Sequence, residues 1–274
     1  MLELPESRVL AQQIQQTLSG RRIASAQAAH SPHGFAWYFG DPAGYADLLE
    51  GAEIQSTRGV GGMLEILLPG RRLLFGDGCN LRLIGPGAKR PAKHQLLLEL
   101  DDGQALAVSV QMYGGIWAYP EGANDNPYYL AACQRPSPLE PAFTLEHFAH
   151  LMDTPKPLSV KALLATEQRI PGLGNGVLQD ILWQARIHPK RKVDTLTDGE
   201  VEGLYQSVRR TLGEMIDRGG RDTEKDLFGR KGGYATIMSR NTVGMPCPRC
   251  GGHSIITKEA FLGGSVYVCT QCQR

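Results

Sequence analysis

The residues best suited to chemistry in this sequence are four cysteines near its C-terminal end, Cys247, Cys250, Cys269 and Cys272. They form two Cys-x2-Cys pairs separated by 18 residues, a spacing typical of a closed tetrahedral zinc site. Between the pairs the sequence predicts a β-hairpin, with strands at 254–256 and 266–268 and a turn at 263–264. Four thiolates leave no open position on the metal, so we expect a structural zinc that stabilises this hairpin. The alternative, two disulfide bonds, needs an oxidising compartment that nothing else in the sequence indicates.

A second chemical feature is the turn Gly172-Leu173-Gly174-Asn175, which precedes a predicted helix. The first N–H groups of a helix attract anions, and the natural anion here is a DNA phosphate. We therefore expect Gly172, Gly174 and the Asn175 side chain to bind DNA. An ordinary helix cap explains this turn at least as well.

Two lysines extend the predicted binding surface. Lys161 and Lys190, the latter within the run Lys190-Arg191-Lys192, place cationic groups where a nucleic-acid backbone can pass. A solvated helix end is the alternative for this run. Residues 1–140 carry 11 Lys/Arg against 14 Asp/Glu, and residues 141–274 carry 18 against 14. The basic excess of the second half favours a nucleic-acid partner, although it is modest for a protein that neutralises many phosphates.

The elements that must position these residues change in character along the chain. Residues 6–19 predict a helix. Residues 21–120 predict short strands, the clearest at 63–68, 72–75, 95–100 and 105–110, with hairpin turns at 69–70 and 101–103. These patterns predict an antiparallel β-sandwich or barrel with the N-terminal helix against it. After a Pro-rich segment the pattern becomes helical, and a capping box from Thr197 to Glu200 begins a helix that Gly219-Gly220 ends.

The predicted fold class is therefore α+β with several domains. We expect a β-sandwich domain over residues 1–125, a linker over 126–143, a helical domain over 144–238 and the four-cysteine zinc finger over 239–274. No apolar run is long enough to span a membrane, and the acidic opening residues predict no secretory signal. Only Cys79 and Cys133 remain beyond the zinc ligands, so we expect a cytoplasmic protein.

Three motifs together resemble the formamidopyrimidine-DNA glycosylase / endonuclease VIII family of base-excision enzymes. The run Glu3-Leu4-Pro5-Glu6 is similar to the family's N-terminal signature. Residues 172–175, the helix after them and residues 187–189 resemble its helix–two-turn–helix DNA-binding element, and the four-cysteine unit resembles its zinc finger. The resemblance spans the whole chain. It implies that damaged duplex DNA binds in a cleft between the two main domains, and we expect a monomer that acts at the bacterial nucleoid.

The same resemblance shows departures at the catalytic end. The family carries proline at position 2, whose amine forms a Schiff base with C1′ of the damaged nucleotide after removal of the initiator methionine. This sequence has Leu2, so the free amine belongs to Met1, about one residue or roughly 3.5 Å of chain away. Glu3 matches the family's catalytic carboxylate and is suited to general acid–base catalysis. The alternative for Glu3 is an ordinary surface glutamate.

Other family residues are also replaced. The family's hairpin lysine falls within residues 58–62, which contain no lysine, and its phosphate-binding arginine falls at about Gly264. The side chains that fill the hole left by an extruded base fall near Asp77 and at 111–113. Here Met112 and Tyr113 are the candidate apolar wedge, and their alternative is an ordinary place in the core.

These features predict a base-excision-repair DNA glycosylase that binds damaged DNA and hydrolyses an N-glycosidic bond, with weak or absent strand cleavage. Met1, Leu2 and Glu3 form its catalytic end, and Glu3 is the only titratable side chain that matches the family's catalytic set. The alternative is a catalytically inactive nucleic-acid-binding protein on the same fold. A third reading, a fold used only for protein contacts, is disfavoured by Lys161, Asn175 and residues 190–192.

Overall fold

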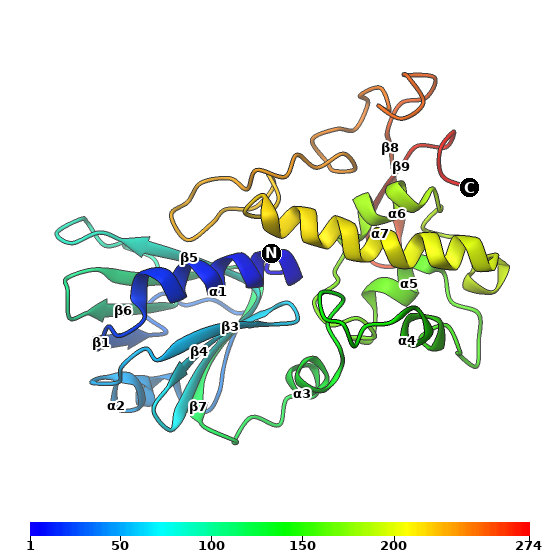
Figure 1. Cartoon of the computed structure of the whole chain (residues 1–274). Coiled ribbons are helices and arrows are strands. Elements are labelled where there is room, and N and C mark those ends of the chain that lie inside the picture. The colour runs from blue at the N-terminus through cyan, green and yellow to red at the C-terminus, as the bar shows by residue number, and fades with distance from the viewer.

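The structure, a computed structural model that describes residues 1–274, has a β-rich half, a helical half and a C-terminal hairpin (Figure 1). The α-helices are α1 (Leu4–Leu18), α2 (Tyr45–Leu49), α3 (Pro127–Gln134), α4 (Leu145–His150), α5 (Val160–Ala165), α6 (Leu178–Ala185) and α7 (Asp198–Asp217). The strands are β1 (Ile23–Ala28), β2 (Ala36–Tyr38), β3 (Ser56–Val60), β4 (Met63–Leu68), β5 (Arg71–Ile84), β6 (Leu96–Leu100), β7 (Ala105–Pro120), β8 (Thr257–Phe261) and β9 (Gly264–Val268). Short 3-10 helices lie at Pro42–Gly44 and Val193–Thr195. No helix is long and apolar enough to cross a membrane.

A seven-stranded sheet forms the N-terminal half, with the order β1-β6-β7-β5-β4-β3 and with β2 paired in parallel to β7. The long strands β5 and β7 pair with each other along their length. At one end of this pair β4 and β3 continue the sheet from β5, and at the other end β6 and β1 continue it from β7. Strands from both ends, together with α1, form one core of 27 buried residues. The predicted β-sandwich with an N-terminal helix is confirmed.

A bulge interrupts the ladder between β5 and β7, where Gly78 on β5 faces three residues, 111–113, on β7. A Cβ at position 78 would lie 2.0 Å from a backbone carbonyl oxygen of the bulge, so only glycine fits there. The extra residues are displaced from the ladder. Met112 has a φ of +68° and is 64% exposed, and Tyr113 is 38% exposed. The alternative that Met112 and Tyr113 are ordinary core residues is therefore wrong.

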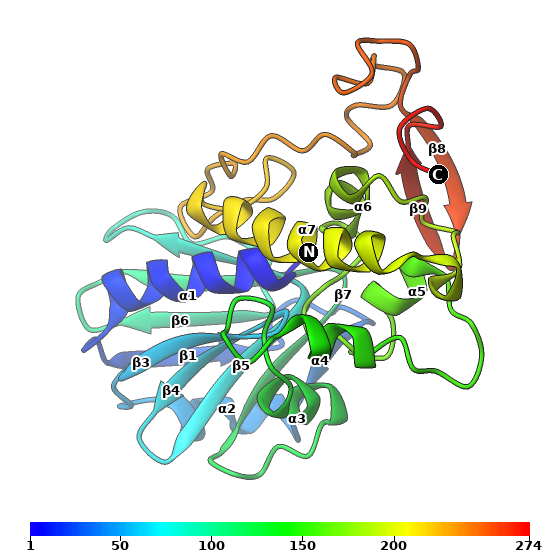
Figure 2. The ribbon, with the colours of Figure 1, turned by 45° about the vertical axis from the view of Figure 1, so that its right-hand side comes forward.

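The helical half has its own core of 19 buried residues, which come mainly from α4, α5, α6 and α7. Leu4, the first residue of α1, belongs to this second core, whereas Leu2 belongs to the sandwich core. In both views α1 and α7 lie side by side where the two halves meet (Figures 1 and 2). The predicted capping box from Thr197 to Glu200 is present at the start of α7. The chain therefore passes between the two cores within its first four residues.

The bounds of several predicted strands differ from those in the structure. The strand expected at 254–256 begins at Thr257, because the preceding residues form the loop after the first cysteine pair. Strands β5 and β7 extend well beyond the predicted 72–75 and 105–110. The segment 126–143, predicted as a linker, contains α3. Asn126 begins this helix by accepting hydrogen bonds from the N–H groups of Tyr128 and Tyr129, with proline at the first helical position.

The turn between β3 and β4 packs directly on the turn that precedes α6. Gly172 has a φ of +81°, and a Cβ there would lie 2.3 Å from the carbonyl carbon of Gly61. The Gly172 carbonyl oxygen also accepts a 2.8 Å hydrogen bond from the N–H group of Leu4. Glycine at this position therefore permits the close approach of the two halves.

We expect Gly172→Ala to destabilise the protein much more than Gly70→Ala. Alanine meets unfavourable backbone strain of roughly 1–2 kcal/mol at either site, because both glycines have a positive φ, +81° and +69°. Only Gly172 lacks space, since nothing lies within 4 Å of a Cβ at Gly70. The added overlap should lower the free energy of unfolding by about 1–3 kcal/mol more, measured by denaturant titration. Equal losses in the two variants would contradict this contact.

Candidate functional site

A cleft of about 310 Å³ lies where the bulge of β7, the start of α6 and the loop after α7 meet. A second cavity of about 340 Å³ lies between α1, β5 and the same loop. The residues that line both cavities are Met1, Gln111, Thr223 and Glu224. The N-terminus thus lies at the junction of the β-rich and helical halves, on a wall common to two cavities.

The N-terminal ammonium group of Met1 forms an ion pair with Glu224 on this shared wall. Met1 is 41% exposed and Glu224 is 25% exposed, so the pair remains accessible from the cleft. Leu2 is 7% exposed and packs into the sandwich core, while its N–H group donates a 2.7 Å hydrogen bond to the Asp77 carbonyl oxygen. At the predicted catalytic end, Met1 therefore presents an amine and Leu2 anchors it.

Glu3 is buried against the start of α6. The alternative that it is an ordinary surface glutamate is therefore wrong. Its carboxylate accepts hydrogen bonds from the N–H groups of Gly176 and Val177, at 2.8 and 2.7 Å. Burial raises the pKa of Glu3, although the charge of Arg221 and these two N–H groups oppose the shift. In the structure, the anion at this helix N-terminus is therefore the Glu3 carboxylate of the protein itself.

Arg221 connects Glu3 to α1 and to the loop after α7. Its guanidinium donates to both carboxylate oxygens of Glu6, at 2.8 and 2.7 Å, and its Nη1 lies 3.4 Å from a Glu3 oxygen. A Cβ at Gly176 would lie 1.8 Å from that Nη1 atom, so glycine there makes room for the guanidinium. Arg221 is 3% exposed. Buried charges of this kind are stable only when paired and hydrogen-bonded, as all three are here.

Asn175 and its neighbour Gln179 hold the β8–β9 hairpin against α6. The Asn175 amide donates a 3.0 Å hydrogen bond to the Ser265 carbonyl oxygen. Gln179 donates to the Asn175 carbonyl oxygen at 2.9 Å and accepts from the N–H group of Tyr267 at 3.0 Å. The side chain predicted to bind phosphate thus fixes the hairpin beside the cleft, and Asn175 also lines the cleft itself.

Two lysines from outside the hairpin contact it. The ammonium group of Lys161 donates to the Phe261 carbonyl oxygen, and burial lowers the pKa of this lysine. Lys190 pairs with Glu259 on β8. A Cβ at Gly264 would lie 3.4 Å from the Lys161 nitrogen, so Lys161 occupies the space next to the position where the resemblance expects an arginine. The structure therefore gathers Lys161, Lys190 and Asn175 at the hairpin.

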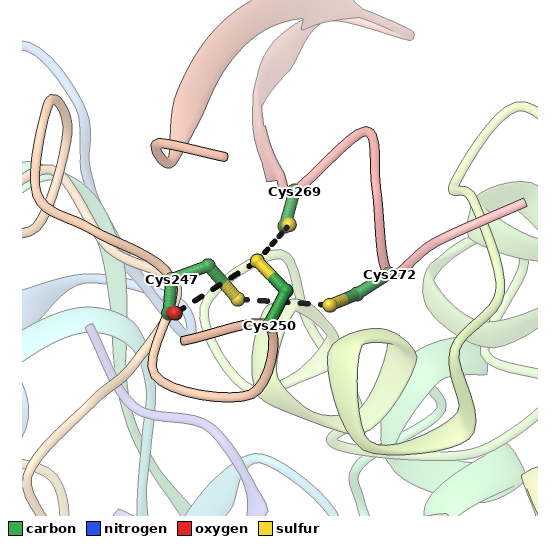
Figure 3. A group of neighbouring side chains, drawn as sticks. All are labelled: Cys247, Cys250, Cys269 and Cys272. Carbon is green, nitrogen blue, oxygen red and sulfur yellow. Dashed lines mark hydrogen bonds between the residues drawn. The ribbon is translucent and has the colours of Figure 1, made fainter. Parts of the chain in front are cut away.

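The four predicted metal ligands converge on one point (Figure 3). Their Sγ atoms all lie within 4.8 Å of one another, with Cys247–Cys272 at 3.8 Å and Cys250–Cys269 at 3.9 Å. Tetrahedral zinc with bonds of about 2.3 Å needs sulfurs about 3.8 Å apart, so the cluster fits zinc. All six cysteines are free, so the alternative of two disulfides is wrong. The indole N–H of Trp183 on α6 donates to Cys247 Sγ at 3.4 Å and joins the cluster to the helical half.

Comparison with known proteins agrees with this arrangement. A family model described as the formamidopyrimidine-DNA glycosylase H2TH domain matches residues 135–226. A formamidopyrimidine-DNA glycosylase of Symbiobacterium thermophilum is 33% identical over 280 residues, which cover 100% of this chain and 89% of that protein. The chain belongs to the formamidopyrimidine-DNA glycosylase family. A family member from Salinispora arenicola is 31% identical over 283 residues, covering 100% of this chain and 96% of its own.

Solved structures of family members have the same fold. The crystal structure of the MutM (Fpg) protein from Thermus thermophilus matches with a TM-score of 0.82 and 24% identity, over 99% of this chain and 98% of that one. Lactococcus lactis Fpg in complex with DNA containing an abasic site matches with a TM-score of 0.83 and 23% identity, over 99% of each chain. The β-rich half, the helical half and the C-terminal hairpin are therefore folded as in these two structures.

Sequence reasoning missed Arg221, Glu6 and Glu224. Arg221 pairs with a residue 215 positions away, and Met1 with one 223 positions away. Only one local signal was available: residue 221 directly follows the Gly219-Gly220 pair that ends α7, where the chain changes direction. That signal locates the loop and does not identify its partners.

Removing the charge of Arg221 should destabilise the fold strongly. Arg221→Met leaves Glu3 and Glu6 buried without their cation, and loss of one partner of a buried pair typically costs about 3–5 kcal/mol. Arg210→Met is the control, because Arg210 pairs with Glu214 at an exposed site on α7, where about 0–1 kcal/mol is expected. Urea titration compares the free energies of unfolding. Similar losses for the two variants would show that Arg221 does not hold the halves together.

Metal analysis tests the cysteine site. We expect about one zinc ion per chain in the purified protein, because the four thiolates complete a tetrahedral set. Cys250→Ser should lower zinc content and weaken DNA binding while the β-sandwich stays folded. Cys133→Ser, at an exposed position in α3, should leave both unchanged. Well under one zinc per wild-type chain would refute the assignment.

Proposed function

We propose that the chain is a DNA glycosylase of base-excision repair that binds damaged DNA in the cleft between its two halves. The observation that carries this proposal is the Met1 amine, held beside Glu224 on the wall of that cleft. Relatives that carry the name formamidopyrimidine-DNA glycosylase align over the whole chain, which supports the same activity. A DNA partner and a four-cysteine zinc site both fit a reducing, cytoplasmic compartment.

The proposed reaction begins with the amine of Met1. To attack C1′ of the damaged nucleotide the amine must first lose its proton, and the Glu224 carboxylate beside it can accept that proton. The new N–C1′ bond forms as the glycosidic C1′–N bond breaks, and the released base takes up the proton that Glu224 accepted. The C1′–O4′ bond then opens, O4′ takes up a proton that the nitrogen loses, and a protonated imine forms. Water then hydrolyses the resulting imine, which regenerates the amine and leaves an abasic site. The proposal takes Met1 as the mature N-terminus, because a bulky second residue disfavours its removal.

Glu3 has a positioning role in this proposal. Both of its carboxylate oxygens are bound by backbone N–H groups of the α6 start, and it is 4% exposed. It fixes residues 2 and 3, so that the preceding amine reaches the cleft. Glu3 is not among the residues that line either cavity, so its carboxyl group is not placed to protonate a sugar there.

Strand cleavage should be weak or absent. Elimination at an abasic site needs a base that removes a sugar proton, and residues 58–62 supply no lysine for this step. That turn instead packs on the turn at 171–172. Displacement of the amine by one residue also disfavours the geometry for a second step at the same sugar.

The proposed DNA surface has two sides. One side lies at the zinc hairpin and positions the backbone of a DNA strand. It consists of Gly172, Gly174, Asn175, Lys161 and Lys190. Met112 and Tyr113 form the other side, and the exposed Met112 side chain is the proposed wedge for the space left by a flipped nucleotide.

A panel of damaged duplexes and an abasic site, with borohydride trapping, tests the proposed chemistry. We expect base release, a trapped adduct at Met1 identified by mass spectrometry, and little strand cleavage. Glu224→Gln should reduce base release by roughly 10²–10⁴-fold, because it removes the proton acceptor. Glu121→Gln, which alters an exposed ion pair with Arg72, is the control and should have no effect.

The other outcomes separate the alternatives. Base release without an adduct would replace the amine with water as the attacking group. Tight binding of damaged duplexes without any base release would support the inactive nucleic-acid-binding protein. An intact mass that lacks Met1 would exclude this amine altogether.

A further inference from the structure

The β-sandwich carries aromatic side chains on an outward face where polar residues are the rule. Strands β2 and β7 pair in parallel here, with Trp37 opposite Gly115. Phe35, Trp37 and Tyr113 are 62%, 47% and 38% exposed. The alternate residues point inward, and Ile116 is fully buried in the sandwich core. An exposed group of large apolar side chains on a folded protein marks a binding surface.

The geometry of this face suits a flat ligand. The rings of Trp37 and Tyr113 lie with centroids 5.9 Å apart and planes inclined by 34°. Gly115, beside them, has no side chain, and the ring of Trp117 covers the place that one would fill, 1.8 Å from a Cβ there. No lysine or arginine stacks on Phe35, Trp37 or Tyr113. The face therefore offers ring surfaces and no stacked cation.

This aromatic face is continuous with the cleft. Tyr113 directly follows Met112, which lines the cleft together with Met1 and Asn175. The Phe35 carbonyl oxygen accepts a 3.0 Å hydrogen bond from the N–H group of Gly114, which ties the segment before β2 to the end of the bulge. A DNA strand that leaves the cleft past Met112 would therefore contact these rings next.

We propose that Phe35, Trp37 and Tyr113 form a stacking platform for unpaired nucleobases of the bound DNA. This inference rests on the proposed function, because it takes DNA as the ligand of the cleft. Every base has a flat face that stacks on an aromatic ring, whereas duplex phosphates need cations, and no cation stacks on these three rings. Bases in an intact duplex already stack on each other. The platform therefore selects DNA in which bases next to the damage are unpaired, such as a bubble or a single strand.

Binding of three DNA probes tests the platform. The probes are an intact duplex, the same duplex with a bubble of unpaired thymines, and a single-stranded thymine oligomer. We expect Trp37→Ala to weaken binding of the bubble and the single strand by about 5- to 150-fold, equivalent to about 1–3 kcal/mol per stacked base. Its binding of the intact duplex should change less than twofold. Trp37→Phe should restore most of the affinity, and Tyr128→Ala, an exposed aromatic residue on α3, should behave as wild type.

Fluorescence of 2-aminopurine placed in the bubble gives an independent readout, because stacking on an aromatic ring quenches it. Wild type should quench this signal and Trp37→Ala should not. Equal losses on all three probes, or unchanged binding by Trp37→Ala, would overturn the platform. Base release is measured separately on the same proteins. If Trp37→Ala releases base and binds the bubble as wild type does, only the platform is refuted. If Trp37→Ala selectively loses bubble binding but neither protein releases base, only the proposed glycosylase is refuted.

Discussion

The hydrogen bonds from the start of α6 to the Glu3 carboxylate are the constraint on which the site depends. A helix N-terminus attracts an anion, and here the anion comes from the third residue of the chain. With Glu3 fixed between the two halves, Leu2 packs into one core and Leu4 into the other. Arg221 then balances the buried charge and brings the loop after α7 to the same place. The amine reaches the cleft as a result of this fixed order.

The other side of the cleft depends on a defect in the sheet. A regular ladder between β5 and β7 would have turned residues 111–113 alternately inward and outward. The bulge over Gly78 instead exposes all three, and Met112 becomes part of the cleft wall. The zinc hairpin completes the surface, because Asn175 and Gln179 hold its backbone against α6. One helix start, one bulge and one hairpin thus meet around the N-terminus.

Features coded by neighbouring residues were predictable from the sequence. The cysteine spacing, the capping box at Thr197 and the glycine turn before α6 are local patterns, and each is present in the structure. The helix N-terminus was recognised as an anion site, but its observed ligand is Glu3, more than 170 residues away. Asn175 and Lys161 were predicted to contact DNA, and the contacts that the structure shows are to the hairpin. Such pairings depend on tertiary packing, which no local pattern encodes. The full length of β5 and β7 was missed because Gly76, Gly78, Gly114 and Gly115 interrupt the strand pattern.

The number of residues in the bulge limits how this wall of the cleft can change through insertion or deletion. Side chains alternate across a strand, so losing one residue from 111–113 would turn every later residue of β7 to the opposite face. Ile116 and Ala118, now in the core, would then face solvent, and Trp117 would face the core. Loss of two residues would keep that alternation and leave one residue opposite Gly78. The length of this segment is therefore free to vary in pairs of residues, and such a step would remove the exposed wall without disturbing the sandwich.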